Sequence, residues 1–374
     1  MQHRILGRTG WRVSAISLGT EYLLDKPLAH VQGVIDRAID RGINYFDLFY
    51  AHPGFRDTLG AALRPRRKDV LLTAHLGAVE IDGQGARSRD IALCQQFFAD
   101  YLRRYHTDYV DVLFLHNCDE EDDYRELMGA PLELAQRLVR QGAARAIGFS
   151  GHTVATALQA VESGVVDVLM FPINLMGHAV PGRAGLFEAC VAHDVGLVAM
   201  KPFAGGRLLQ PAARLSAEFW QRGGEEMQVE RHVSITSAQC LSYVLAQPGV
   251  STLVPGCADL AQLDDVLHYW EASDAERDYA EIVADFAQYT EGECVYCNHC
   301  LPCPAVIDIG QTIRLYDLAQ GGLGESRRLA LDAQYAAMPN RASDCIQCGA
   351  CEARCPFGVA VIETMERATA LFGA

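Results

Sequence analysis

The 374-residue sequence predicts an α/β protein, a (β/α)8 TIM barrel followed by a smaller, helical, cysteine-rich domain. Eight short, nearly continuous apolar runs alternate with helix-length amphipathic segments, which is typical of parallel strands covered on both faces. The length suits a barrel of about 250 residues plus an appendage. Eight cysteines in two short runs near the C-terminal end indicate the second domain. We place the barrel at residues 1–285 and the second domain at 286–374.

The predicted strands follow one another from residue 15 to residue 256. In chain order they are AISLG (15–19), INYFDLF (43–49), VLLTAHL (70–76), YVDVLFLHN (109–117), RAIGFSG (145–151), VDVLMFPIN (166–174), VGLVAMKPF (195–203) and VSTLVPG (250–256). Before them, RILGRTGWRV (4–13) predicts a hairpin around Gly7 to Gly10 that closes one end of the barrel.

Polar residues appear where these strands end. Because the carboxyl ends of barrel strands converge on the active site, these residues form the candidate site. They are Asp47, His75, His116, Ser150, Asn174, Lys201 and Gly256.

The two cysteine runs predict two [4Fe–4S] clusters. The second run has the C-x2-C-x2-C-x3-C-P spacing of bacterial ferredoxins, in which the fourth cysteine ligates the other cluster. The first run is one residue shorter between its third and fourth cysteines. We therefore assign one cluster to Cys294, Cys297, Cys300 and Cys355, and the other to Cys345, Cys348, Cys351 and Cys303.

Structural zinc is the alternative for these cysteines, since C-x2-C pairs also form tetrahedral sites. Zinc needs only four ligands, and the repeated register closed by proline favours iron–sulfur. The segment between the runs has the apolar spacing of helices, which predicts an α-helical ferredoxin-like domain. The other five cysteines are predicted to be buried free thiols; they are Cys94, Cys118, Cys190, Cys240 and Cys257.

Six segments, in order, resemble landmarks of the aldo-keto reductase family. They are RILGRTGWRVSAISLGT, GINYFD, DYVDVLFLH, ARAIGFSGHT, VGLVAMKPFAGGRLL and VSTLVPG. With the cysteine-rich tail, the chain resembles the branch of that family that carries a C-terminal ferredoxin domain. The resemblance implies an oxidoreductase that uses a nicotinamide cofactor and a tetrad of Asp, Tyr, Lys and His.

The sequence matches only part of that tetrad. Asp47 and His116 match the family's aspartate and histidine, but His75 stands where lysine is usual. The spacing of the family's tyrosine falls on His52, and Tyr50 lies two residues earlier. Either Tyr50 or His52 is the candidate proton donor, and packing or plain exposure is the alternative for each.

Four histidines follow neighbouring strands of the predicted barrel. They are His75, His116, His152 and His178. Two of them with Asp47 would supply the two-His, one-carboxylate ligands of a divalent metal. We favour a proton-relay or substrate-binding role, because imidazole donates and accepts hydrogen bonds near neutral pH.

The resemblance also implies cofactor positions. Ser150 matches a residue that holds the nicotinamide amide, while Lys201, Gly205, Gly206 and the backbone after Gly256 are candidates to meet a pyrophosphate. The helix after Gly256 lacks a basic residue for a 2′-phosphate, so NAD(H) is favoured over NADPH. A flavin stays open as a converter between hydride and single-electron transfer.

Composition and charge exclude several classes of partner. A formal net charge of −15 without a basic cluster argues against nucleic-acid binding. We find neither an apolar run of membrane length nor a signal peptide, which favours a cytoplasmic protein that does not enter the membrane.

Three functions are compatible with the sequence. The first is an iron–sulfur oxidoreductase that acts on a carbonyl, hydroxyl or activated double bond of a small organic substrate, with a ferredoxin or flavoprotein as electron donor. The second is an electron-transfer module without nicotinamide chemistry. The third is a histidine-based lyase or isomerase with structural clusters.

Overall fold

The computed structural model describes residues 1–210, 213–222, 225–283, 292, 294, 296, 298–320 and 325–373. The predicted boundary between residues 285 and 286 lies outside these residues, as does Cys297. The chain forms two compact units. The first comprises Met1–Ile173, Pro181–Pro202 and Val244–Ala272; the second comprises Asn174–Val180, Phe203–Tyr243 and Ser273–Ala374.

The first unit contains the predicted barrel. Eight strands form one sheet in the order β14-β11-β10-β9-β8-β5-β4-β3, and each strand pairs with its neighbours in parallel. Their bounds are β3 (Leu18–Gly19), β4 (Tyr45–Asp47), β5 (Leu71–Leu76), β8 (Val110–Leu115), β9 (Ala144–Ser150), β10 (Val168–Pro172), β11 (Gly196–Met200) and β14 (Val250–Val254). Parallel bridges between Ile16 and Leu253 and between Gly19 and Gly256 close the sheet. The eight predicted strands are confirmed, although β3 is shorter than predicted.

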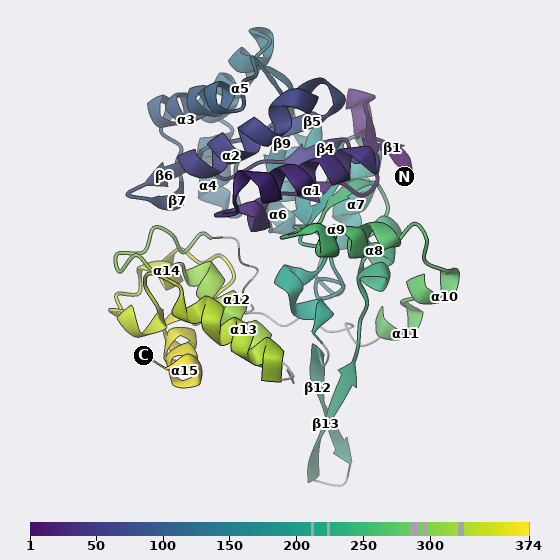
Figure 1. Cartoon of the computed structure of the whole chain (residues 1–374), viewed down its shortest axis with the longest axis vertical. Coiled ribbons are helices and arrows are strands. Elements are labelled where there is room, and N and C mark those ends of the chain that lie inside the picture. Colours follow the sequence, from purple (N-terminus) through teal and green to yellow (C-terminus); the bar gives the residue numbers. More distant parts are fainter. Residues whose placement is uncertain are drawn as a thin grey trace. The chain divides into compact units, whose positions relative to one another are not determined.

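Amphipathic helices follow the barrel strands (Figure 1). They are α1 (Leu28–Asp40), α2 (Pro53–Leu63), α3 (Ile91–Arg104), α4 (Glu121–Leu127), α5 (Ala130–Arg140), α6 (Val154–Glu162), α7 (Arg183–Ala192) and α9 (Leu260–His268). α3 shows how the sequence specifies such a helix. Asp90 caps its first turn by accepting from Leu93 N at 2.7 Å, while Cys94, Phe98 and Tyr101 form its buried face.

A small hairpin of β1 (His3–Ile5) and β2 (Arg12–Ser14) closes the end of the barrel where the strands begin. Leu6 and Val13 are fully buried and pack in the barrel core with Phe114 and Val198. Gly7 has φ +46°, and a Cβ there would lie 2.2 Å from the backbone nitrogen of Gly196, the first residue of β11. Only glycine permits this approach, so the predicted position of the hairpin is confirmed.

A second hairpin of β6 (Ala78–Ile81) and β7 (Gln84–Arg87) follows β5. Short 3-10 helices occupy Gly7–Thr9, Glu21–Leu23 and Arg64–Asp69. In the barrel unit, the loops that follow the strands line their carboxyl ends.

The second unit is mostly helical, as predicted for the C-terminal domain. Its antiparallel hairpin consists of β12 (Ala213–Arg222) and β13 (Glu225–Val233). Its helices are α10 (Asp274–Arg277), α11 (Ala280–Val283), α12 (Ile309–Gln320), α13 (Glu325–Ala336), α14 (Ala350–Ala353) and α15 (Val361–Phe372), with 3-10 helices at Ala204–Leu209 and Ala342–Asp344. α8 (Ser237–Leu245) continues from this unit into the first.

The core of the helical unit lies between α12, α13 and α15. Ile313 and Leu315 of α12 pack with Tyr335 of α13 and with Val361 and Met365 of α15. These helices support the loops that carry the two cysteine runs, so the cysteines lie around an apolar core.

Among the described residues, none of the helices combines the length and the apolar character that crossing a bilayer requires.

Candidate functional site

Three predicted catalytic residues form one hydrogen-bonded chain at the carboxyl ends of β4, β5 and β8. His75 Nε2 lies 3.0 Å from Asp47 Oδ1, and His75 Nδ1 lies 3.0 Å from His116 Nδ1. Thr73 Oγ1 also donates to Asp47 Oδ1 at 2.8 Å. Asp47 and His75 are buried, whereas His116 is half-buried. The chain therefore runs from a buried carboxylate to an imidazole with access to solvent.

The hydrogens in this chain follow from its partners. Asp47 accepts, so His75 Nε2 carries a hydrogen. Only one hydrogen fits between the two Nδ1 atoms, because two would collide. The imidazole pair therefore holds at most three N–H hydrogens: one toward Asp47, one shared, and one on His116 Nε2.

Packing fixes the orientation of both imidazoles. The ring of His75 stacks on Phe114, with centroids 4.9 Å apart, and Phe49 stacks on His116 at 6.4 Å. Arg89 Nη1 donates to the backbone oxygen of His116 at 2.8 Å. These contacts hold the Asp47–His75–His116 relay in place. Among the described residues, its side chains do not meet at one point as the ligands of a metal ion would.

The two candidate proton donors of the β4–α2 loop make mainly local contacts. Tyr50 is half-buried; its ring lies 4.2 Å from that of Phe49, and its backbone oxygen accepts from Arg56 Nε at 3.0 Å. His52 is exposed and caps α2 by accepting from Phe55 N at Nδ1, 3.2 Å away. His52 therefore has a structural role as a helix cap, and its proposed catalytic role stays a prediction.

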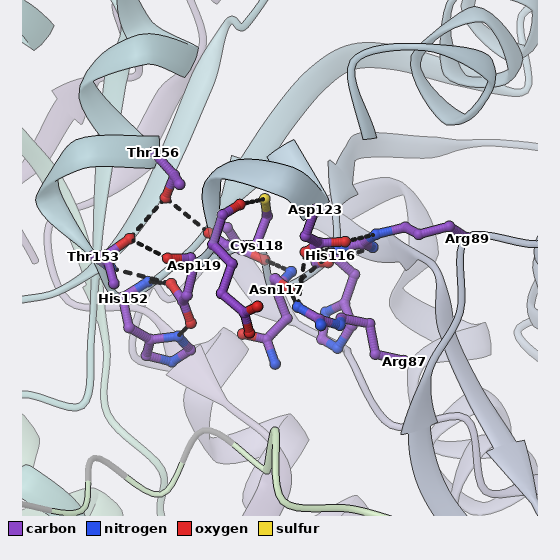
Figure 2. A network of polar contacts seen from close by, with 12 residues as sticks. Arg87, Arg89, His116, Asn117, Cys118, Asp119, Asp123, His152, Thr153 and Thr156 are labelled. Atoms are coloured by element: carbon purple, nitrogen blue, oxygen red, sulfur yellow. Dashed lines mark hydrogen bonds and ion pairs between the residues drawn. The ribbon is translucent and has the colours of Figure 1, made fainter. Parts of the chain in front are cut away.

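A second chain of polar residues lies in the same unit, at the ends of β9 and β11. His152 Nδ1 lies 2.8 Å from Asp119 Oδ2, and Lys201 Nζ lies 3.1 Å from His152 Nε2. Asp119 also accepts from the backbone nitrogens of His152 and Thr153 (Figure 2). Burial lowers the pKa of His152, and the charge of Lys201 adds to this, while Asp119 offsets part of it. His152 is therefore neutral and links the carboxylate to the lysine.

Two arginines stabilise the loop between these chains (Figure 2). Arg87 and Arg89 both pair with Asp123 at 2.8 Å and donate to the backbone oxygen of Asn117. Burial raises the pKa of Asp123, but the hydrogen bonds and charges of the arginines outweigh it, so this pKa lies below its usual value. Arg87 at the end of β7 and Arg89 two residues later thereby fix the backbone that carries His116.

The environment of Gly256 does not suit a dinucleotide pyrophosphate. A Cβ at Gly256 would lie 2.7 Å from Glu21 Oε1, so a carboxylate borders the backbone there. Asp259 caps α9 by accepting from Gln262 N at 2.9 Å, and Gln262 Oε1 accepts from Ala258 N at 2.8 Å. The N–H groups of Ala258 and Gln262 thus have partners within the chain, and the nearby carboxylates oppose an anion. The role of Gly256 in holding a pyrophosphate stays a prediction.

Ser150 and Gly151 lie at the end of β9, at the predicted nicotinamide position. Ser150 is buried, and its hydroxyl accepts from Asn117 N at 2.9 Å. A Cβ on Gly151 would lie 2.5 Å from the backbone oxygen of Cys118, which leaves no room for a side chain at that position. The role of Ser150 in holding a nicotinamide therefore stays a prediction.

Gly205 and Gly206 belong to the helical unit, where they meet the iron–sulfur domain. Arg314 Nε of α12 donates to Gly205 O at 2.8 Å, and a Cβ on Gly205 would lie 2.5 Å from the ring of Tyr296. Tyr296 is held by its hydroxyl, which donates to Asp317 Oδ2 at 2.7 Å. Packing against the cluster domain gives a structural reason for glycine at position 205 that needs no bound pyrophosphate.

Replacing Gly205 by alanine is expected to lower the apparent melting temperature of the intact protein by several degrees. The new Cβ would collide with Tyr296, and φ +66° is unfavourable for alanine, which together cost about 2–3 kcal/mol. Gly164→Ala is the matched control, because φ is +75° there but nothing lies within 4 Å of a Cβ. Equal decreases of the melting temperature in both variants would show that the Tyr296 contact does not contribute to stability.

Seven of the eight cluster cysteines lie in described parts of the helical unit, around two cavities. The first is lined by Cys300, Cys303, Cys345, Cys348 and Cys351; the second is lined by Cys294, Cys300 and Cys355. Both cavities are lined by cysteines of both runs, as an exchange of fourth ligands would require, and the assignment of each cysteine to a cluster stays a prediction.

Contacts between the runs support this arrangement. Arg354, next to Cys355, donates to Cys300 O at 2.6 Å and to Pro302 O at 2.9 Å. Tyr296 N donates to Cys294 Sγ at 3.4 Å, the kind of N–H···S contact that tunes iron–sulfur clusters. In the described part of the chain, no three His, Cys, Asp or Glu side chains converge on one metal ion. The thiols that line both cavities are the ligands that iron–sulfur clusters use.

The remaining predicted residues have other surroundings. His178 belongs to the helical unit, and its Nδ1 lies 2.9 Å from the hydroxyl of Tyr243. The five scattered cysteines are free and buried, as predicted. The four histidines are thus divided between different partners, and they do not form one cluster.

Two residues of these hydrogen-bonded chains were not predicted from the sequence. Thr73 is a hydroxyl within an otherwise apolar strand, and that interruption is a signal that could have identified it. Asp119 lies in the acidic run DEEDD (119–123), where nothing distinguishes it from solvated neighbours. Only the fold shows that it is buried against His152.

Comparisons with known proteins agree with this architecture. A family model described as aldo/keto reductase family matches residues 15–284, and one described as 4Fe-4S dicluster domain matches residues 292–359. An uncharacterised oxidoreductase, YqkF, from Bacillus subtilis is 27% identical over 322 residues, which cover 80% of this chain and 99% of the relative. The L-glyceraldehyde 3-phosphate reductase of Escherichia coli K12 is 26% identical over 227 residues, 56% of this chain and 63% of that protein.

Among solved structures, the holo form of an aldo-keto reductase from Bacillus halodurans has a TM-score of 0.62 at 22% identity and covers 78% of this chain and 98% of its own. That likeness supports the fold. With the family match over more than half of the sequence, the barrel and the cysteine cavities lead to one conclusion: this chain is an oxidoreductase that belongs to the aldo/keto reductase family and carries a C-terminal 4Fe-4S dicluster domain.

Proposed function

We propose that the protein reduces the carbonyl or activated double bond of a small organic substrate, using protons from the Asp47–His75–His116 relay and single electrons from its iron–sulfur domain. The observation that carries the proposal is the unbroken hydrogen-bonded chain from buried Asp47 to half-buried His116. The reverse reaction, oxidation of a hydroxyl, would use the same residues.

The relay supplies the acid that the usual lysine and tyrosine supply in relatives. Reduction of a carbonyl to an alcohol needs two electrons and two protons. His116 Nε2 gives the proton to the oxygen or carbon that receives it, and His75 with Asp47 holds the His116 ring in position. Solvent at the exposed side of His116 restores the proton for the second step.

The residues of the chain favour electron entry through the cysteine-rich domain. When bound, two [4Fe–4S] clusters would supply single electrons, which a ferredoxin or flavoprotein can provide. Glu21 and Asp259 oppose a dinucleotide at Gly256, and Gly205 packs against Tyr296, beside Cys294. NADH is therefore not part of the proposed route.

Anaerobic assays with two electron donors test this route. Reduced methyl viologen, a one-electron donor, is expected to be oxidised when pyruvate, crotonate or a neutral aldehyde is added, whereas NADH should show neither saturable binding nor oxidation. The mutant Cys345→Ala serves as the control, since it should lose the viologen reaction. Substrate-dependent NADH oxidation that persists in Cys345→Ala would overturn the electron route.

A further inference from the structure

We infer that Arg354 is a positioning residue for one of the two cluster sites. It holds the short link that carries Cys303 into one cavity, and its charge raises the reduction potential of a cluster bound there. The Cys345 cavity is the one lined by Cys300, Cys303, Cys345, Cys348 and Cys351, and the Cys294 cavity is the one lined by Cys294, Cys300 and Cys355. The inference rests on the 4Fe-4S dicluster domain and not on the reaction proposed for the barrel.

The two cysteine runs differ in the link between their third and fourth cysteines. In the second run three residues form this link, whereas in the first run only Leu301 and Pro302 separate Cys300 from Cys303. Cys300 lines both cavities, but among the described lining residues Cys303 belongs to the Cys345 cavity alone. The shorter link therefore leads from a position shared by both cavities into the Cys345 cavity.

The two links are stabilised in different ways. The longer link contains a helical turn, α14, and Cys355 N donates to Glu352 O at 3.1 Å. The shorter link contains Pro302, which has no backbone N–H to donate. Backbone carbonyls in such a segment need donors from elsewhere, and here a side chain of the second run supplies them.

Arg354 is that side chain. Its Nη2 donates to Cys300 O at 2.6 Å and to Pro302 O at 2.9 Å, and its Nε donates to His299 O at 3.3 Å. A guanidinium presents its N–H groups in a rigid planar fork, so the directions of the carbonyls that it binds are set together. Arg354 therefore fixes the backbone on both sides of Leu301, in the segment that ends at Cys303.

The same guanidinium places a positive charge at the Cys345 cavity. Arg354 lines that cavity and is not among the described residues that line the Cys294 cavity. It is half-buried, and its three acceptors are neutral carbonyls, which do not cancel its charge. A cluster gains a negative charge on reduction, so a fixed cation beside it favours the reduced state and raises the reduction potential.

Anaerobic redox titration of the substrate-free, full-length protein, followed by electron paramagnetic resonance, tests the charge. Arg354→Met removes the charge and the donors but keeps an unbranched stem. It is made in two backgrounds, Cys294→Ala and Cys345→Ala, each of which leaves the thiolates of the other cavity intact. In Cys294→Ala, Arg354→Met should lower the equilibrium constant for reduction by about ten-fold, about 59 mV for one electron, and in Cys345→Ala by less than about two-fold.

Two further variants separate the hydrogen bonds from the charge. Arg354→Lys keeps the charge without the planar fork, so in the Cys294→Ala background the reduction constant should stay within about two-fold. Iron should nevertheless be lost to an anaerobic chelator about ten-fold faster, because the link is held less firmly. Arg367→Gln removes the charge of a side chain that is 60% exposed on α15, and it should change neither the potential nor the rate of iron loss.

The outcomes distinguish a local role from a general one. Loss of the cluster on Arg354→Met in the Cys294→Ala background alone would support the inference, since only that site depends on the short link. Equal shifts or equal losses in both backgrounds would overturn it, as would shifts below about two-fold in both. If the cysteine variants hold no cluster, Arg354→Met with both runs intact decides: one of two signals should shift, and a joint shift or none would overturn the inference.

The result is separable from that of the proposed function. Because no substrate is present, the titration does not depend on the relay, and His116→Gln should titrate like the wild type. Absence of carbonyl reduction alongside a shifted potential in Arg354→Met would refute only the proposed function. Viologen-driven reduction alongside unchanged potentials and unchanged iron loss in the Arg354 variants would refute only the role of Arg354.

Discussion

Replacing His116 by glutamine is expected to lower kcat for viologen-driven reduction by about 100-fold or more, with KM nearly unchanged. Removal of a positioned general acid costs about 10² to 10⁴ in rate. Glutamine retains a hydrogen-bonding side chain of similar size but cannot transfer the proton. The measurement is anaerobic steady-state kinetics across pH 5.5–8.5 with a carbonyl substrate.

The other members of the relay give a graded control. His75→Gln should also reduce kcat strongly, because glutamine breaks the link from Asp47 to His116, whereas His193→Gln alters an exposed histidine and should leave kcat unchanged. If His116→Gln retains kcat within about three-fold, the relay is not the proton source. A selective loss in Tyr50→Phe or His52→Gln would then place the donor in the β4–α2 loop.

Substitution of single cysteines is expected to abolish viologen-driven reduction and to remove one cluster at a time. Cys345→Ala and Cys294→Ala should each lower iron and inorganic sulfide from about eight to about four per chain, because each removes a thiolate from one [4Fe–4S] site. Elemental analysis and electron paramagnetic resonance of the reduced proteins provide the measurement.

The cavities predict which variants share a phenotype. Cys303→Ala should leave the same residual spectrum as Cys345→Ala, and Cys355→Ala the same as Cys294→Ala, because each pair lines one cavity. Cys190→Ala changes a buried free thiol of α7 and should keep both clusters. Matching spectra for Cys303→Ala and Cys294→Ala would mean that each run ligates its own cluster.

Local patterns were sufficient to predict the architecture. Each apolar run became a barrel strand because parallel strands are covered on both faces, and the segments between cysteine runs became α12 and α13 because their apolar residues have helical spacing. Asp47, His75 and His116 could be proposed together, since strand ends of a barrel meet at one mouth.

Partners within the site could not be predicted in this way. Four histidines after neighbouring strands suggested one cluster, but His75 pairs with His116, His152 with Asp119 and Lys201, and His178 with Tyr243. Loop conformation determines these pairings, and it depends on contacts such as those from Arg87 at the end of β7 and from Arg89 two residues later.

The sequence by itself determined the barrel, the helical tail and the two sets of cysteines, because these follow from periodicity and spacing along the chain. Only the tertiary structure decided that Gly205 packs against Tyr296, that Gly256 is bordered by an acidic side chain, and that Lys201 meets a neutral histidine. Those outcomes depend on distances between residues far apart in the chain, which local patterns do not encode.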